Sequence, residues 1–530
     1  MAHTYTYFAG FILCACLIRI FVLPKSGVLP KGLPIIGAKT SDWFPLWQAA
    51  LRNSLDLRRA VLEAYENYHD QAAILPVLGP GAQNFVLLPA SETKHVTAQP
   101  DTILNLRQVI TQGLLYKYTV ANQILVDQPV HKKLINSTLT NQVGNLLPAL
   151  ADETIRGFAQ RWGNDTLSFV DVTVWDSLGD IVAMVTNRAF VGLPYCRNRA
   201  LLNAGVGFAR AVPISQLLLS FLWRPLRGPL SPLLTLPCRW YEWRFTQLLI
   251  PEVEKRLRIF DDKKVAENDF LQWSIDQAKE SGDHGLQDAR TLAGRILLLN
   301  LVSIHTSSLT ITNVVLDLAS CRQPEVIQEL REEIELVLAQ SNGIWTKAAL
   351  AKMEKLDSVL RESARLNTLI AVGLRRYVVA EEGFTTTDGT HIPYGNYCAV
   401  HNLGVVHDPK VYDEANHFRP FRFLGLRRGI ATGHRTDDHV QSARLTFAST
   451  TTDYLAFGNG RQACPGRFFA AAELKLLLAY ILMFYDFEML PERPADKWVG
   501  IIRIPSSSAK IRVRRRKAEA VPDFSWAATE

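Results

Sequence analysis

The residues best suited to chemistry lie in a stretch near the C-terminus that reads Phe457-Gly-Asn-Gly-Arg-Gln-Ala-Cys464-Pro-Gly-Arg-Phe-Phe469. Its three glycines allow positive φ angles, so the backbone can come close to a flat ligand. The proline after Cys464 suits the first position of a helix, and the text from Arg467 onward is strongly helix-forming. Cys464 would then lie at a helix N-terminus, where free amides and the helix dipole lower the pKa of a thiol. We interpret the stretch as a loop that offers one thiolate to a bound ligand.

Two other interpretations of Cys464 stay open at the level of its residues. An isolated cysteine is often a buried structural residue, because free Cys behaves as a small hydrophobic side chain. The run from Gly458 to Ala463 also fits the G-x-G-x-x-A fingerprint of a dinucleotide site. That fingerprint needs a preceding strand in a βαβ unit, whereas the preceding text is rich in Thr, Ser and Asp.

The Cys464 stretch resembles the haem-binding signature of the cytochrome P450 family, Phe-x-x-Gly-x-Arg-x-Cys-x-Gly. Phe457, Gly460 and Cys464 match it, as does the glycine after the proline. The resemblance implies haem b, with Cys464 as the axial ligand of the iron. The family's arginine contacts a haem propionate, but its position holds Gln462, so this contact would come from Gln462, the adjacent Arg461 or elsewhere.

An apolar segment from Ala289 to Ala319 predicts one long helix. About thirty helical residues measure roughly 45 Å, so this helix must cross a core. Hydroxyl side chains gather at its middle, where they can bond back to backbone carbonyls. The segment is similar to the family's central helix, whose (Ala/Gly)-Gly-x-(Asp/Glu)-Thr motif manages oxygen and proton delivery. Thr306 keeps the threonine, and His305 stands at the acid position; it can relay protons or be a satisfied core histidine.

Glu362 and Arg365 are spaced i, i+3 on a predicted helix and can form an ion pair. An exposed pair of this kind would carry little weight. The family, however, has Glu-x-x-Arg at this place, completed by an arginine downstream. Arg422 in the run Phe418-Arg-Pro-Phe-Arg-Phe423 matches that arginine. The resemblance therefore implies a buried structural network that holds the cysteine loop.

Further basic residues are expected at the haem propionates. Leu369–Val379 is predicted to be a strand, and family spacing after Glu-x-x-Arg places a propionate-binding arginine at Arg375. The first residues of the strand, up to Gly373, would face the substrate. His131 and Lys132 open a predicted helix where the family carries a basic pair. A solvated basic turn is the alternative interpretation of that pair.

Composition limits the class of protein. The chain has 530 residues, of which 48% are hydrophobic and 21% charged, as in globular proteins with a large core. A formal charge of +7 is too small to indicate nucleic-acid binding. Seven scattered cysteines predict neither a disulfide framework nor a zinc site, and they suit a reducing compartment.

The N-terminal region predicts a membrane anchor. Tyr5–Leu23 is nearly all apolar and would span about 28 Å as a helix. Cationic residues follow the segment, which places the rest of the chain in the cytosol. A cleaved signal peptide fits less well, because no Lys or Arg precedes the segment and no small-x-small site follows it. We expect an anchor at 1–24, a proline-rich hinge at 25–40 and a haem-thiolate catalytic domain at 41–530.

The sequence thus predicts a mainly α fold with a small β lobe, the cytochrome P450 fold, behind an N-terminal transmembrane helix. The resemblance implies a monooxygenase of the endoplasmic reticulum membrane that receives electrons from NADPH through cytochrome P450 reductase. A bulky apolar metabolite is the expected substrate, of the terpenoid, meroterpenoid or indole diterpene kind found in fungal secondary metabolism. A haem-thiolate isomerase or dehydratase and a non-catalytic membrane haem protein are the alternatives.

Overall fold

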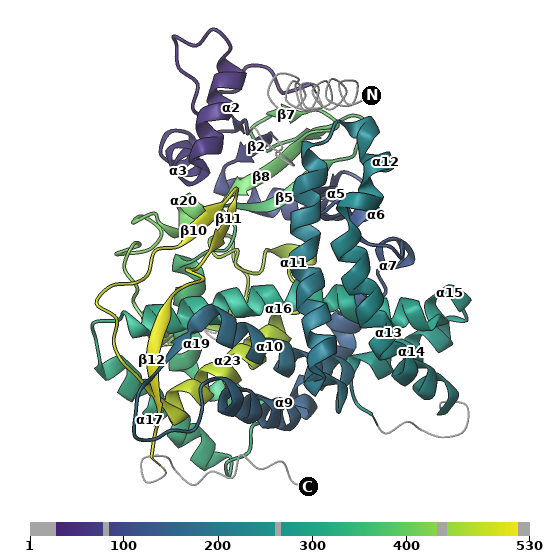
Figure 1. Cartoon of the computed structure of the whole chain (residues 1–530). Coiled ribbons are helices and arrows are strands. Elements are labelled where there is room, and N and C mark those ends of the chain that lie inside the picture. Colours follow the sequence, from purple (N-terminus) through teal and green to yellow (C-terminus); the bar gives the residue numbers. More distant parts are fainter. Residues whose placement is uncertain (1–27, 78–83, 260–266, 432–441, 518–530) are drawn as a thin grey trace, which may run out of the picture.

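The computed structural model describes residues 28–77, 84–259, 267–431 and 442–517. The predicted anchor lies outside these residues and stays a prediction. Residues 28–40 of the predicted hinge contain no helix. The chain forms a large helical lobe and a smaller lobe built around a sheet (Figure 1).

The helical lobe is organised around α16 (Ala289–Ala319), which lies across the middle of the molecule in Figure 1. Asp288 caps it by accepting a hydrogen bond from the amide of Thr291. The helix is apolar on nearly all sides, which is the pattern of a helix buried in a core. Its observed bounds are those that the apolar segment predicts.

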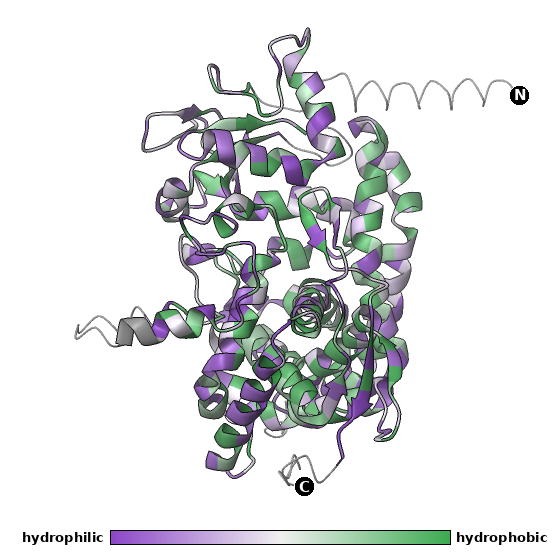
Figure 2. Ribbon diagram, turned by 90° about the vertical axis from the view of Figure 1, so that its left-hand side faces the viewer, coloured by the Kyte–Doolittle hydropathy of each residue, from purple (hydrophilic) through white to green (hydrophobic). Residues whose placement is uncertain are grey.

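Other long helices pack around α16. In the half of the chain before it, the helical lobe contains α9 (Thr140–Arg161), α10 (Val174–Val191), α11 (Arg199–Phe221), α12 (Arg224–Leu234), α13 (Leu236–Ile259) and α14 (Phe270–Ser281). After α16 come α17 (Glu325–Gln340), α18 (Lys347–Lys352), α19 (Glu354–Leu366), α21 (Arg422–Ala431) and α23 (Arg467–Phe484). Figure 2 shows hydrophobic ribbon at the centre of this lobe and hydrophilic ribbon toward its outside. One continuous hydrophobic core includes side chains of α9, α10, α16 and α23.

The smaller lobe holds a five-stranded sheet in the order β1-β2-β8-β5-β3. These strands are β1 (Ala73–Leu75), β2 (Phe85–Leu88), β3 (Leu104–Asn105), β5 (Val372–Val378) and β8 (Tyr397–His401). Strands β2 and β8 run parallel, and the other neighbours are antiparallel. Strands β1 and β2 form an antiparallel pair, and the predicted strand that carries Arg375 is confirmed.

Short helices flank the sheet and lead from it to the helical lobe. They are α2 (Pro45–Leu55), α3 (Leu57–Tyr68), α4 (Thr93–Ala98), α5 (Leu106–Gly113), α6 (Tyr116–Thr119), α7 (Ile124–Asp127), α8 (His131–Leu134) and α20 (Leu403–Val406). Helix α15 (His284–Gln287) lies in the helical lobe and packs against α14 and α16. The remaining strands form small sheets: β4 (Val170–Thr173), β6 (Phe384–Thr385), β7 (His391–Ile392), β9 (Tyr485–Phe487), β10 (Lys497–Val499), β11 (Ile502–Ile504) and β12 (Lys510–Arg515). Helices α2 and α3 are separate, because Asp56 ends the first and caps the second by accepting a hydrogen bond from the amide of Arg59.

Among the described residues, α11 and α16 are long and apolar enough to span a membrane. Half of the apolar window of α11 and 67% of that of α16 are buried inside the protein. Core helices of globular proteins meet the same criteria, so these two helices are weak evidence for a membrane span.

Candidate functional site

The Cys464 loop closes on itself before α23 begins. The amide of Cys464 donates a hydrogen bond to the carbonyl of Phe457, 2.8 Å away. Gly458 and Gly460 have φ angles of 71° and 69°, as predicted. A Cβ on Gly460 would lie 2.8 Å from the Cβ of Thr97, so this glycine also permits a close approach. Glycine is therefore required at Gly460 both by conformation and by space.

The start of the following helix differs from the prediction. Helix α23 begins at Arg467, and Gly466 is its N-cap at a φ of −83°. Pro465 lies in the turn before the helix rather than in its first helical position. The prediction of a positive φ at Gly466 is also wrong, because the turn reaches the helix through ordinary backbone geometry.

The pKa of the Cys464 thiol is raised, which contradicts the predicted decrease. The side chain keeps accessible surface, yet protein atoms crowd around the sulfur, and this desolvation disfavours the thiolate. Hydrogen bonds from the amides of Gly466 and Arg467 and the charge of Arg467 act in the expected direction but are outweighed. A bound cation would reverse this balance, because a coordinating thiol is deprotonated.

The middle of α16 presents an open face. Val302 is 50% exposed and Thr306, one turn later, is exposed as well, although α16 crosses the core. The Thr306 hydroxyl lies 3.0 Å from the carbonyl oxygen of Val302 and 3.1 Å from that of Ser303. Its single hydrogen is thus directed at the helix backbone, and its lone pairs can accept a hydrogen bond on the open face. The predicted bonding of hydroxyls back to the helix is confirmed, and the helix continues unbroken.

The imidazole of His305 lies against α11. Burial lowers the pKa of its imidazole, the charge of Arg210 lowers it further, and a hydrogen bond with the backbone of Ala209 acts the other way. His305 is therefore neutral at pH 7. Its ring makes a hydrogen bond with α11, as a satisfied core histidine does, and the role in proton relay stays a prediction.

Arg461 and Gln462 are both engaged by the protein itself. Arg461 Nη2 donates to the carbonyls of Ala98 and Gln99 at 3.1 and 3.2 Å. Gln462 Nε2 donates to the carboxylate of Asp101. Both candidates beside Cys464 thus donate hydrogen bonds to the end of α4 and the segment after it.

Three other basic residues are predicted to contact the haem propionates. The guanidinium of Arg375 on β5 makes no hydrogen bond or ion pair with the described residues, and burial lowers its pKa. His131 starts α8; its Nδ1 is buried without a partner in the described chain, and burial lowers its pKa to about 4. Lys132 is exposed. Burial lowers the pKa of Arg376, next to Arg375, and the charge of the Asp101 carboxylate acts the other way. Because Asp101 also accepts a hydrogen bond from Gln462, β5 lies close to the Cys464 loop.

Sequence reasoning missed two buried polar residues near this site. Glu473 on α23 is fully buried and accepts hydrogen bonds from the hydroxyls of Thr186 and Ser307 at 2.6 and 2.9 Å. Burial raises its pKa to about 7. Arg295 on α16 is 1% exposed. Both are charged residues inside long, predominantly apolar helices, and that signal could have identified them.

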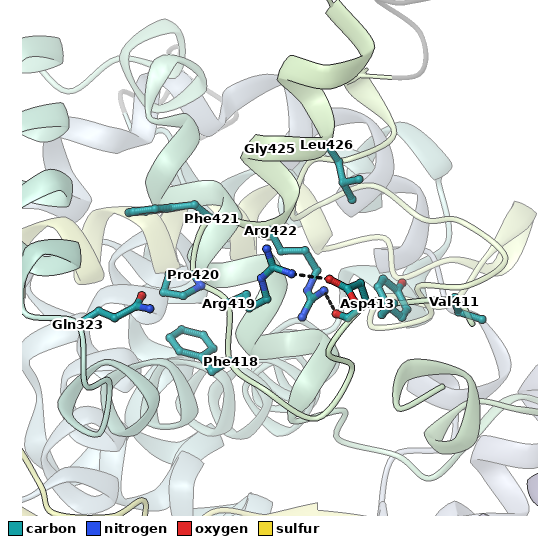
Figure 3. A pocket seen from close by; sticks show the side chains of 11 residues that line it. Gln323, Val411, Asp413, Phe418, Arg419, Pro420, Phe421, Arg422, Gly425 and Leu426 are labelled. Carbon is teal, nitrogen blue, oxygen red and sulfur yellow. Dashed lines mark hydrogen bonds and ion pairs between the residues drawn. The ribbon is translucent and has the colours of Figure 1, made fainter. Parts of the chain in front are cut away.

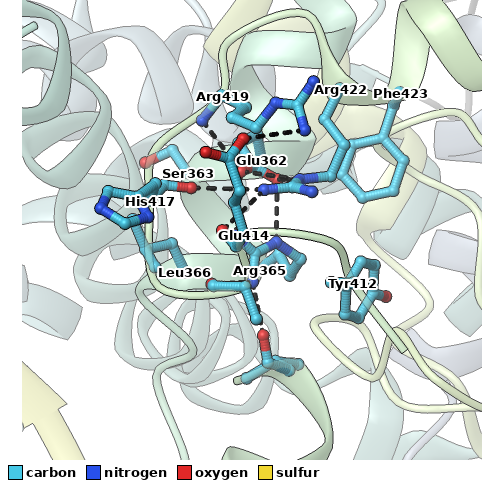
Figure 4. A network of polar contacts seen from close by, with 12 residues as sticks. Glu362, Ser363, Arg365, Leu366, Tyr412, Glu414, His417, Arg419, Arg422 and Phe423 are labelled. Carbon is cyan, nitrogen blue, oxygen red and sulfur yellow. Dashed lines mark hydrogen bonds and ion pairs between the residues drawn. The ribbon is translucent and has the colours of Figure 1, made fainter. Parts of the chain in front are cut away.

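The predicted network around Glu362 is confirmed (Figure 4). Its carboxylate accepts from Arg365 Nε at 2.8 Å and Nη2 at 2.9 Å, and from Arg422 Nε at 3.0 Å. Glu362 and Arg365 are completely buried, and Arg422 is nearly so. Arg365 also donates to the carbonyls of Val406 and Ala415, so the network joins α19 to the segment that leads into α21.

Neighbours of this network connect it to the cysteine loop. The guanidinium of Arg361 lies over the rings of Phe423 and Tyr454, 4.6 and 3.9 Å from their centroids. Phe447 packs edge-on against Phe457, with the ring centroids 5.1 Å apart. The link to the loop therefore passes through aromatic packing.

A cavity of about 540 Å³ lies elsewhere, between the residues around Phe418 and the start of α21 (Figure 3). Arg419 and Arg422 line it, and Arg419 is paired with Asp413 at 2.8 Å. None of its lining residues is Cys464 or Thr306, so this cavity is separate from the site formed by the cysteine loop and α16.

The residues present fit a haem held by a thiolate. Cys464 offers an accessible sulfur with amides directed at it. The two haem propionates require hydrogen-bond donors. His131 Nδ1 is buried and the Arg375 side chain partly buried, and neither group has a partner in the described chain. Among the described residues no cluster of His, Cys, Asp and Glu competes as a metal site.

Comparison with known proteins agrees with this geometry. Residues 131–511 match the family model for cytochrome P450. The chain is 29% identical to cytochrome P450 monooxygenase astC of Aspergillus terreus (strain NIH 2624 / FGSC A1156), over 92% of each chain. It is 30% identical to cytochrome P450 monooxygenase gloP of Glarea lozoyensis (strain ATCC 20868 / MF5171), over 90% of each chain. It is 32% identical to cytochrome P450 monooxygenase 71 of Postia placenta (strain ATCC 44394 / Madison 698-R), over 82% of this chain and 84% of that one.

Enzymes of this kind use a haem whose iron is bound by a cysteine thiolate, together with electrons derived from NADPH. The family match covers most of the chain, and the relatives with the same description span nearly its full length. The chain therefore belongs to the cytochrome P450 family and is a monooxygenase of that family.

Proposed function

We propose that this enzyme inserts one oxygen atom from O2 into a bulky apolar metabolite of fungal secondary metabolism, of the terpenoid, meroterpenoid or indole diterpene class. The observation that carries the proposal is the open face of α16, where the Val302 side chain is half exposed beside the Thr306 hydroxyl. An apolar surface next to one hydrogen-bonding group suits a hydrophobic substrate whose reacting carbon has no polar handle. The fungal monooxygenases to which the chain is similar support the reaction type.

Cys464 is the proposed axial ligand of the haem iron. A haem with thiolate ligation supplies the activation of O2 when it is bound. Arg375 and His131 are the proposed partners of the propionates, with Lys132 as an exposed cation at the rim. Arg461 and Gln462 are further candidates, although Arg461 Nη2 and Gln462 Nε2 already donate to residues 98–101.

Thr306 and His305 have separate proposed roles. With its hydrogen directed at the α16 backbone, the Thr306 hydroxyl accepts a hydrogen bond on the open face and so fixes a water molecule there. His305 is neutral at pH 7, and the ring nitrogen that does not donate to the backbone of Ala209 can take up a proton.

The proposed location is the endoplasmic reticulum membrane, with residues 1–24 as a single-pass anchor and a cytosolic catalytic domain that receives electrons from NADPH-cytochrome P450 reductase. Exposed apolar side chains support membrane contact. Trp43 and Phe44 before α2 are 90% and 70% exposed, and Leu233 of α12 is 65% exposed. Helices α2 and α12 both lie toward the upper end of the molecule in Figure 1, so one membrane surface can meet them together.

The test is production of the full chain in a fungal host, with a reductase, followed by comparison of metabolites with a strain that carries Cys464→Ser. The expected result is one or more products heavier by oxygen that depend on Cys464, NADPH and O2. Product formation without NADPH or O2 would instead identify an isomerase or dehydratase. A ferrous carbonyl spectrum without thiolate character would refute the ligation by Cys464.

A further inference from the structure

Arg295 lies on the same face of α16 as the open site. Eleven residues separate it from Thr306, which is three turns and a rotation of only about 20° at 3.6 residues per turn. The two residues are therefore about 16 Å apart along one side of the helix. Val302, seven residues after Arg295, lies between them on that side.

The guanidinium of Arg295 is buried without a partner. Its Nε and Nη2 atoms are inaccessible and donate to no acceptor among the described residues. Burial lowers its pKa to about 10, and no carboxylate of the described chain counteracts this shift. An uncompensated charge in a protein interior is strongly destabilising, so a natural sequence retains one only where something offsets it.

Other arginines buried to the same degree show how the chain ordinarily treats such groups. Arg256 is 1% exposed and pairs with Glu252 and Asp269 at 2.8 and 2.7 Å. Arg365 pairs with Glu362. Arg361 stacks on two aromatic rings and donates to a backbone carbonyl. The lack of partners at Arg295 is therefore a local exception in the described chain.

His131 lies beside Arg295 and shares the exception. Burial lowers the pKa of His131, and the positive charge of Arg295 lowers it further, so the two side chains lie close to each other. Helix α7, just before His131, packs on α16, where Leu125 would contact a Cβ placed on Gly294. The Nδ1 atom of His131 is also buried without a partner in the described chain. The side chains of Arg295 and His131 thus lie at the same end of the open α16 face, and each has nitrogen atoms without a hydrogen-bond partner in the described chain.

We propose that Arg295, with His131 beside it, binds a carboxylate group in the interior of this protein. Guanidinium binds carboxylate through paired N–H donors, and the two free atoms of Arg295 provide such a pair. The carboxylate is either a propionate of the haem or an acid group of the substrate, held about three helical turns from Thr306. This inference rests on the proposed function, since both sources presuppose a haem enzyme.

The test uses the full-length holoenzyme and three variants. Arg295→Met removes the charge and keeps a long side chain, and Arg295→Lys keeps a charge. Arg290→Met makes the same change at an exposed position of α16 and serves as the matched control. The ferrous carbonyl spectrum of each protein is recorded first, because a wild type without thiolate character would refute the proposed function rather than this inference.

Two readouts separate the sources of the carboxylate. In the first, dodecanoic acid and methyl dodecanoate are titrated into each protein while the Soret band is followed. In the second, the rate of haem transfer to excess apomyoglobin is measured. An acid substrate predicts that the wild type prefers the acid over the ester about tenfold or more and that Arg295→Met loses this preference. A propionate predicts haem transfer about tenfold faster in Arg295→Met.

Arg290→Met should match the wild type in both readouts, and Arg295→Lys should lie between the wild type and Arg295→Met. If neither the acid preference nor the haem-transfer rate changes in Arg295→Met, the inference is overturned. Should Arg295→Met fail to accumulate as a folded protein, Arg295→Lys decides the question in the same way, because loss of the paired donors must still change one of the two readouts. An unchanged Lys variant would then overturn the inference.

Discussion

Replacement of Glu362 by alanine should strongly destabilise the protein. The side chain is completely buried and accepts hydrogen bonds from Arg365, Arg422 and the amide of Arg419. Its loss leaves two guanidinium groups without their counter-charge, one of them completely buried. Breaking a buried ion pair by removing one partner costs about 3–5 kcal/mol.

Glu488 offers a matched control at the surface. Both of its carboxylate oxygens accept from Arg512 Nη1, at 2.9 and 3.1 Å, but the two side chains are 44% and 52% exposed. Solvent screens such a pair, so Glu488→Ala should cost less than about 1 kcal/mol. The hydrogen-bond lengths of the two carboxylates are similar, and burial is the main difference between them.

The assay is equilibrium urea unfolding of wild type, Glu362→Ala, Glu362→Gln and Glu488→Ala, followed by circular dichroism and by the Soret band. Coincident transitions by the two probes would justify a two-state free energy. Glu362→Gln should lie between wild type and the alanine variant, since the amide keeps acceptor capacity but not the charge. Equal and small losses for Glu362→Ala and Glu488→Ala would refute the assignment of Glu362 as a buried structural centre.

Three further outcomes can be measured. The Glu473 carboxyl, with a pKa raised to about 7, keeps its proton in the folded protein up to that pH but ionises near 4.5 in the unfolded chain. The free energy of unfolding of the wild type should therefore fall by up to ~3 kcal/mol between pH ~4.5 and ~7 relative to Glu473→Gln, and parallel pH profiles would contradict this. Gly460→Ala places a Cβ 2.8 Å from Thr97 at a φ of 69° and should cost more than about 1 kcal/mol in urea unfolding, with an unchanged midpoint as the contrary result. Cys464→Ser should abolish the thiolate-type ferrous carbonyl spectrum while far-UV circular dichroism stays the same, and a retained spectrum would exclude Cys464 as the ligand.

Local sequence patterns predicted a large part of the fold. The bounds of α16 follow from its apolar text and from Asp288 as a cap, because a helix that is apolar on all sides has to be buried. The pair Glu362 and Arg365 follows from their spacing on one helix. The match of Arg422 to a family motif supplied a partner 60 residues away that spacing alone would not have found.

Other features depend on residues that are distant in the sequence. Arg461 and Gln462 were predicted as possible contacts of a propionate. In the structure, Arg461 Nη2 and Gln462 Nε2 bond to residues near position 100, more than 350 residues earlier. The pKa of Cys464 depends on the atoms packed around its sulfur, and helix position alone predicted the wrong direction. Neither the partners of Arg461 and Gln462 nor the packing around the Cys464 sulfur can be inferred from residues that are neighbours in the sequence.

The sequence by itself determined the chemistry that this protein can perform: a single cysteine in a glycine loop before a helix, and a threonine at the middle of a long apolar helix. These are properties of residue type and spacing, and the chain keeps them in any environment. Only the tertiary structure decided which charges have partners. Arg365 and Arg295 are both arginines in buried helices, yet one meets a carboxylate and the other meets none in the described chain. The physical reason is that the free energy of a buried charge depends on the groups that the fold places around it.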